Sequence, residues 1–238
     1  MIGTKRVTLA FIGLWICLVG LVYAEAPQFF QTSKTERIDF PTGGQLSLKN
    51  STGDLTIQGW ERRDVELTTT LSTKDPFDAR DRDKALKELD LVHVTTERHG
   101  NELVIQTDFP KYGRFKPLLG AKTRFDISYH VNVPSKAGVS IEHGSGYVGI
   151  DGITGDIHVT ASQGEITVRL PEQGQYAIDA KSKLGDVISD FGGRTERKMW
   201  FLGKQVTGEA TGAAQKIFLR AGYGDIIILK SATYKKPQ

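Results

Sequence analysis

Apolar and polar residues alternate along much of this chain, most clearly over residues 140–170. Three glycines in this stretch, Gly146, Gly155 and Gly164, are each followed by one residue and then by an alternating apolar pair. They are nine residues apart (155 − 146 and 164 − 155). Side chains of a strand point alternately to its two faces, so this pattern predicts short strands with one buried face. Nine residues leave no room for a helical crossover, and the region is predicted to be all-β.

The same unit recurs elsewhere, with copies beginning at Gly53, Gly185 and Gly224 and a weaker copy at Gly174. Glycine supplies the positive φ that sharp corners require. We therefore interpret six glycines as structural turns: Gly53, Gly146, Gly155, Gly164, Gly185 and Gly224.

Alternate copies are about 20 residues apart, a spacing typical of a solenoid in which each rung buries its face against the next. One predicted stack contains Gly146, Gly164 and Gly185, and the other begins with Gly155 and Gly174. The predicted fold is an all-β, β-solenoid-like stack of short strands with one short helix. An antiparallel β-sandwich with short hairpins is the alternative.

Two stretches interrupt the alternation. Residues 79–90 fit a short helix with a charged, solvated face, which would cover a sheet edge or an end of the solenoid. Residues 109–124 are irregular and basic. Four residues there are candidates for binding an anionic glycan or polymer: Tyr112, Arg114, Phe115 and Lys116. The alternative is a solvated loop.

The N-terminus has the composition of an export signal. Lys5 and Arg6 precede an uncharged run over residues 7–24, which ends at the small residue Ala24. An uncleaved membrane anchor is the alternative, because the run is longer than the usual signal core of about 7–15 residues. We expect the following organisation: a signal peptide over 1–24, a linker over 25–36, a single β-repeat domain over 37–230 and a tail over 231–238.

Composition excludes several classes of function. The single cysteine, Cys17, lies in the leader, so the exported chain has no disulfide, cysteine nucleophile or thiolate metal site. Without Lys5 and Arg6, 29 basic residues (31 − 2) face 28 acidic ones, and this balance argues against nucleic-acid binding. Nucleotide-binding and serine-hydrolase motifs are missing from the sequence, and no cofactor is expected.

Acidic residues recur directly after the repeat glycines: Asp54, Asp156, Glu165, Asp186 and Asp225. An aspartate at a corner accepts hydrogen bonds from backbone N–H groups, so we interpret these acids as structural rather than catalytic. His143, Asp156 and His158 are weak candidates for a metal site or an acid–base pair, since Asp156 and His158 share a predicted strand face. The alternative is three unrelated surface side chains, with no metal bound.

Residues 46–60, the Asn-Val-Pro run at 132–134, residues 207–214 and the closing Gly-Asp-Ile at 224–226 resemble a bacterial family. It is the exported domain-of-unknown-function family labelled putative adhesins, and the resemblance covers residues 37–230. It implies a right-handed β-solenoid-like fold, a place at the cell envelope and no enzymatic activity.

The sequence therefore favours a non-enzymatic, exported envelope protein that acts as an adhesin-like structural or interaction scaffold, whether periplasmic, cell-surface or secreted. A glycan- or anionic-polymer-binding module is the first alternative, and a glycan-active enzyme working near Asp156 and His158 is the second. An envelope glycan or another envelope protein fits as partner. Membrane contact is expected only through an uncleaved leader.

Overall fold

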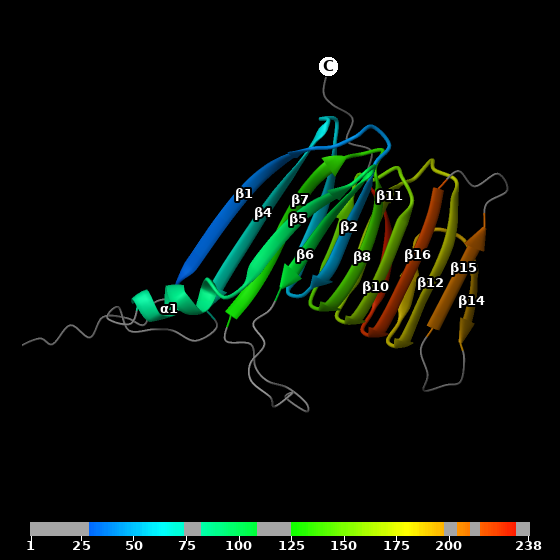
Figure 1. The fold of residues 1–238 in the computed structure, drawn as a ribbon. Helices are drawn as coiled ribbons and strands as arrows, with labels where there is room; N and C mark the ends of the chain where they lie inside the picture. Colours follow the sequence, from blue (N-terminus) through cyan, green and yellow to red (C-terminus); the bar gives the residue numbers. More distant parts are fainter. Residues whose placement is uncertain (1–28, 74–81, 109–124, 198–203, 210–214, 232–238) are drawn as a thin grey trace, which may run out of the picture.

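The computed structural model describes residues 29–73, 82–108, 125–197, 204–209 and 215–231. They form two large β-sheets with a buried apolar core, and one short helix, α1 (Arg82–Leu89), at the N-terminal end of the sheets (Figure 1). The predicted all-β class with one short helix is confirmed. Among these residues, no helix has the length and apolar character needed to traverse a lipid bilayer.

Both sheets are mixed, with parallel strands at the centre. Antiparallel strands lie at both ends of the nine-stranded sheet but only at the β1 end of the eight-stranded one. In spatial order, the eight-stranded sheet contains β1 (Gln31–Asp39), β4 (Asp64–Thr73), β7 (Phe125–Pro134), β3 (Asp54–Trp60), β9 (Val148–Asp151), β11 (Ile166–Pro171), β17 (Ile226–Ser231) and β13 (Val187–Ser189). The nine-stranded sheet contains β14 (Arg194–Arg197), β15 (Lys204–Glu209), β12 (Tyr176–Leu184), β16 (Gln215–Tyr223), β10 (Ile157–Gln163), β8 (Gly138–Ser145), β2 (Gln45–Ser51), β6 (Glu102–Asp108) and β5 (His93–His99).

Five strand pairs form the repeating centre of the molecule, and we call each pair a rung. In each rung the chain leaves the nine-stranded sheet, turns at a glycine and continues in the eight-stranded sheet: β2–β3, β8–β9, β10–β11, β12–β13 and β16–β17. Successive strands of the stack are parallel, unlike those of an antiparallel sandwich.

The rungs do not stack in chain order. The last rung, β16–β17, lies between β10–β11 and β12–β13 in both sheets. A regular solenoid is therefore not confirmed. The predicted stack of Gly146, Gly164 and Gly185 is corrected as well, because Gly224 lies between the last two glycines.

β1 begins at Gln31, inside the span expected to be a linker. It pairs antiparallel with β4 along its whole length, from Gln31 opposite Ser72 to Asp39 opposite Asp64. The alternation that predicts strands elsewhere is weak in β1, because most of its side chains are exposed.

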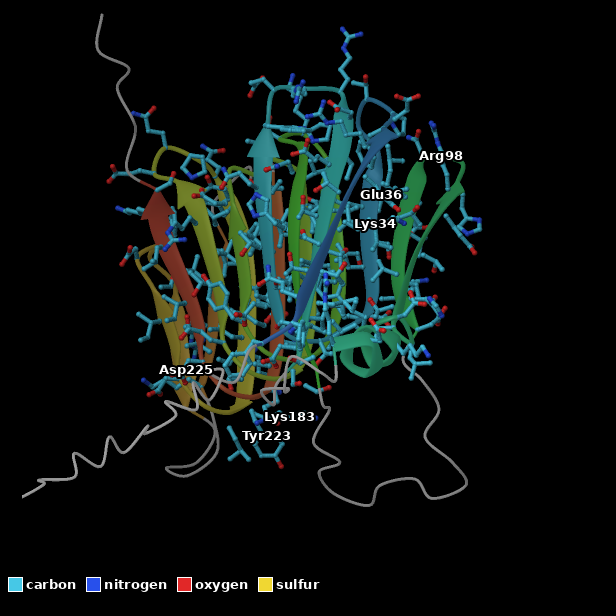
Figure 2. The ribbon with its side chains drawn as sticks, turned by 90° about the vertical axis from the view of Figure 1, so that its left-hand side faces the viewer. Lys34, Glu36, Arg98, Lys183, Tyr223 and Asp225 are labelled. Atoms are coloured by element: carbon cyan, nitrogen blue, oxygen red, sulfur yellow. The ribbon has the colours of Figure 1, made fainter. Side chains whose placement is uncertain are left out.

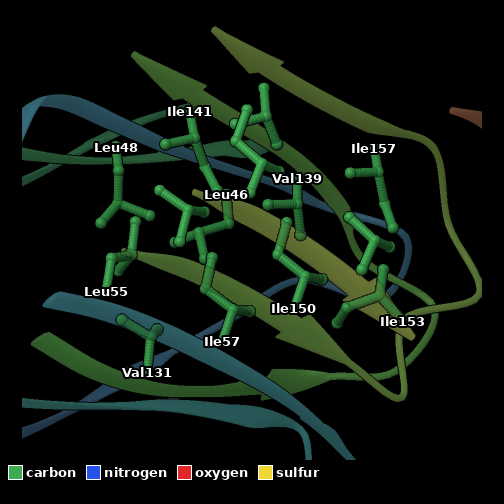
Figure 3. Packing of buried hydrophobic residues seen from close by; sticks show 14 of the residues in the cluster. Leu46, Leu48, Leu55, Ile57, Val131, Val139, Ile141, Ile150, Ile153 and Ile157 are labelled. Carbon is green, nitrogen blue, oxygen red and sulfur yellow. The ribbon is translucent and has the colours of Figure 1, made fainter. Parts of the chain in front are cut away.

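The core lies between the two sheets and consists mainly of aliphatic side chains from alternate strand positions (Figure 3). Leu46 and Val139 from the nine-stranded sheet and Ile57 and Ile150 from the eight-stranded sheet are at most 1% exposed. Burying an aliphatic side chain of this size contributes about 1.5–3 kcal/mol. The inward positions are therefore occupied by packing, which leaves the outward positions and the irregularities of the strands for binding.

One glycine from each rung lies at the corner between the sheets, and together these glycines form a ridge: Gly53, Gly146, Gly164, Gly224 and Gly185. At Gly164 the φ angle is +118°, and a Cβ there would overlap the carbonyl oxygen of Gly146 in the next rung. Gly155 differs, since it lies at the opposite end of the strands without a positive φ. Its close approach to the carbonyl oxygen of Ala137 leaves no space for a side chain.

Several of the acids that follow repeat glycines bind backbone amides of the neighbouring rung. Asp225 Oδ1 accepts a hydrogen bond of 2.7 Å from the Asp186 N–H, and Asp54 Oδ1 accepts one of 3.4 Å from the Tyr147 N–H. These carboxylates link adjacent corners of the ridge, an arrangement that agrees with a structural role.

Replacement of Gly164 by alanine is expected to destabilise the protein by about 2 kcal/mol or more, because both the φ angle and the adjacent carbonyl disfavour a Cβ. Gly192→Ala is the matched control, since no atom lies within 4 Å of a Cβ at that position. Thermal unfolding of both variants measures the difference. Equal losses of stability would contradict the close packing of the ridge.

Candidate functional site

A depression of about 810 Å³ lies where β2, β8 and β10 approach the ridge. Its lining comes from those strands, the end of β6 and the turn after β2: Ser51, Thr52, Thr107, Asp108, Ser140, Glu142, His143, Gly144, His158, Thr160 and Ser162. Most of these residues are polar, and six of them carry a hydroxyl group.

A β-bulge in β2 accounts for the position of this depression. Leu48 is opposite Ile141 and Ser51 is opposite His143. Between these two pairs β2 advances by three residues and β8 by two, so β2 contains one extra residue. The pairing of β2 with β6 ends at Lys49 opposite Gln106, and beyond it the ends of the two strands are no longer hydrogen-bonded as a ladder. A bulge of this kind re-aims side chains and commonly adjoins functional sites.

His143 is a buried member of the lining, with only 3% of its surface exposed. Its Nδ1 lies 2.9 Å from the Ser51 hydroxyl, whereas its Nε2 is buried without a hydrogen-bond partner among the described residues. Burial lowers the pKa of His143, against smaller opposing effects of the Gly53 and Ser145 backbone and the Asp54 carboxylate. The imidazole is therefore neutral near pH 7.

A second buried polar pair, Thr107 and Tyr129, lies close by in space, since Thr107 also lines the depression. The Thr107 and Tyr129 hydroxyls are 2.7 Å apart, and burial raises the pKa of Tyr129 to about 12. This pair satisfies two hydroxyls that would be costly to bury alone, so its role is to complete the core behind the depression.

His158 belongs to the outer face of the nine-stranded sheet and begins a chain of contacts across three strands. Its ring stacks on Phe218 of β16 at 4.4 Å between centroids, with 19° between the planes. The Arg220 guanidinium lies 3.7 Å from the centre of the Phe218 ring and forms an ion pair with Asp179 of β12. The register places Ser140, His158, Phe218 and Asp179 in one row across β8, β10, β16 and β12.

The three candidate metal or acid–base residues are brought together only in part. His143 and His158 line the same depression, but Asp156 does not. The Asp156 carboxylate instead accepts a hydrogen bond of 2.8 Å from the Lys216 N–H, at the start of the strands. Within the described part of the chain, no group of three histidine, cysteine or acidic residues is arranged to hold a metal ion.

The four candidate binding residues of the basic stretch, Tyr112, Arg114, Phe115 and Lys116, lie outside the described residues. Phe218, Arg220 and Asp179 were not singled out from the sequence. Phe218 had a usable signal, because it lies between the buried residues Ile217 and Leu219 and must therefore point outward. The sequence contains no comparable signal for Ser51, because its contact with His143 depends on the β-bulge in β2.

Comparison with known families finds one model, described as Toastrack DUF4097, that matches residues 36–229. A search of curated proteins finds no match. Among solved structures, the chain is similar to a “putative cell adhesion protein” from Clostridium sporogenes, with 17% identity and a TM-score of 0.50 over 84% of this chain and 100% of that one. A “putative adhesin” from Bacteroides fragilis has 12% identity and a TM-score of 0.34, over 83% of this chain and 97% of that one.

The stability of the protein is expected to fall as the pH decreases below about 6.5, in part because of His143. Burial lowers the pKa of this residue in the folded chain, so the unfolded chain takes up a proton at a higher pH than the folded chain does. Above that pH both forms are neutral and the residue adds no pH dependence.

Denaturant unfolding at pH 7 and pH 5 measures this effect in the wild type and in His143→Gln. The variant is expected to lose less stability between the two pH values than the wild type. His130→Gln, at an exposed position on β7, is the control and should behave like the wild type. If His143→Gln lost as much stability between pH 7 and pH 5 as the wild type, a lowered pKa of His143 would not account for the pH dependence.

Proposed function

This chain belongs to the Toastrack DUF4097 family, and from that premise we propose that it is a non-enzymatic, exported scaffold of the bacterial envelope with an adhesin-like role. In this proposal the partner lies across the outer face of the nine-stranded sheet, over the row from Ser140 to Asp179. The charged leader with its uncharged run supports export, and the names of the structural neighbours agree with a place at the cell surface.

The observation that carries the proposal is the regular row of outward side chains. Ser140, His158, Phe218 and Asp179 lie on four adjacent parallel strands, which are spaced about 4.8 Å apart in a sheet. Stacking and ion pairing hold the His158, Phe218 and Arg220 side chains in place before any partner arrives. A preorganised, flat row of this kind suits an extended partner, because binding need not order the side chains.

An envelope glycan is the partner that the chemistry of this face favours. The hydroxyls of Thr160 and Ser162 and the carboxylate of Glu142 adjoin His158 in the depression. Hydroxyl, carboxylate and imidazole groups donate and accept hydrogen bonds, as sugar hydroxyls do. We propose this face as the glycan-binding surface, while the candidate residues of the basic stretch lie outside the described residues.

His158→Ala is expected to weaken binding to peptidoglycan roughly tenfold, because it removes both a hydrogen-bonding group and the support of Phe218. Co-sedimentation of the purified full chain with peptidoglycan measures the change. His130→Ala is the matched control, an exposed histidine on β7 in the other sheet. If both variants co-sedimented with peptidoglycan to the same extent, this face would not be the binding surface. If the wild type did not co-sediment, peptidoglycan would not be the partner.

A further inference from the structure

A second cavity, of about 490 Å³, lies between the β1 edge of the eight-stranded sheet and the β5 edge of the nine-stranded sheet. Its lining comes from β1, β4, α1 and β5: Thr32, Lys34, Glu36, Leu67, Thr69, Leu71, Leu86, Lys87, Leu89, Asp90, Val92, His93 and Val94. The volume lies within the range of about 300–1,000 Å³ that is usual for small-molecule sites. We call this cavity the end pocket.

One wall of the end pocket is apolar. Leu67, Leu89 and Val92 are at most 5% exposed and belong to the core, whereas Leu71 and Val94 are only partly buried. Partly exposed aliphatic groups that converge on a concave space provide a contact surface for an apolar ligand.

β1 adds a polar strip beside the β4 part of this wall, because Thr32 pairs with Leu71 and Glu36 with Leu67 in the ladder. Thr32, Lys34 and Glu36 face the pocket, while the residues between them pair with side chains of β4 on the outer face, as Thr35 does with Thr68. Figure 2 views this end of the molecule and shows Lys34 and Glu36 beside β1, on the side of the nine-stranded sheet. Over Thr32 to Glu36, β1 carries polar side chains at positions that are mostly apolar in the central strands, and it contacts the core only further along, at Ile38. The pocket is therefore amphipathic.

Charges of both signs surround the apolar wall. Lys34 and Glu36 pair with each other. Lys87, in the last turn of α1, and Asp90, just after it, line the pocket and have no ion-pair partner among the described residues. Two such charges of opposite sign on one wall complement a headgroup that itself carries both charges.

We propose that the end pocket binds a single-chain amphiphile with a zwitterionic headgroup. The apolar chain contacts Leu71, Leu86 and Val94, the anionic part of the headgroup faces Lys87 and the cationic part faces Asp90. This site is separate from the outer face of the nine-stranded sheet and does not depend on the function proposed for that face.

Titration of the full chain with dodecylphosphocholine, below its micelle concentration, tests the proposal by calorimetry. We expect saturable 1:1 binding that Leu86→Lys weakens at least tenfold, since a charge would replace the apolar contact. Leu91→Lys is the matched control, because Leu91 is 46% exposed and lies outside the pocket. Val94→Lys is a second pocket variant for the case in which Leu86→Lys impairs folding, and thermal unfolding monitors both.

The headgroup is tested with dodecyl maltoside, which is neutral, and dodecanoate, which is anionic. Lys87→Gln and Asp90→Asn should each weaken dodecylphosphocholine about fivefold and leave dodecyl maltoside unchanged. The uncharged run of residues 7–24 is a second place where the chain could take up an amphiphile. Binding that is insensitive to both pocket variants would assign the amphiphile to that run and overturn the proposal, as would tighter binding of dodecanoate than of dodecylphosphocholine.

Discussion

The close approach of backbones at the glycine ridge is the constraint on which the rest of the structure depends. Each corner fits against the carbonyl group of the next one, and the amide groups of the corners continue the hydrogen bonding from rung to rung, as in Gly164 N–H to Tyr223 O at 2.8 Å and Gly224 N–H to Leu184 O at 2.8 Å. Because the corners are hydrogen-bonded, both sheets stay in the same register, and the aliphatic layers between them pack without slipping.

This repetition also decides where binding chemistry can occur. Inward positions are apolar along most of each rung, and two polar exceptions, His143 and Ser182, lie near the ridge. Distinctive side chains therefore gather on the outer faces, at bulges and at the ends of the stack. The depression arises at the bulge of β2, and the end pocket arises where β1 stops following the apolar pattern. Both features are departures from the repeat rather than parts of it.

Much of the fold follows from local patterns. The alternation predicts the strands, and the glycines mark the corners, because both depend on single residues and their neighbours. The order of the rungs cannot be predicted from local patterns. Gly185 and Gly224 lie in equivalent local sequences, and only long-range pairing decides which of them neighbours Gly164. Within the site, the outward direction of His158 is predictable from alternation. The approach of His143 to Ser51 is not, because a bulge leaves no periodic signal.

The insertion of β16–β17 between two earlier rungs has a consequence for how the chain matures. A polypeptide delivered from its N-terminus can pair its rungs in sequence as far as β10–β11, but β12–β13 then has no adjacent rung until β16–β17 arrives. Completion of the stack therefore requires that synthesis has passed β16–β17. In a chain that terminates before β16–β17, the edge strands of β10–β11 and β12–β13 that this rung would cover stay unpaired. Exposed strand edges of that kind promote aggregation and degradation.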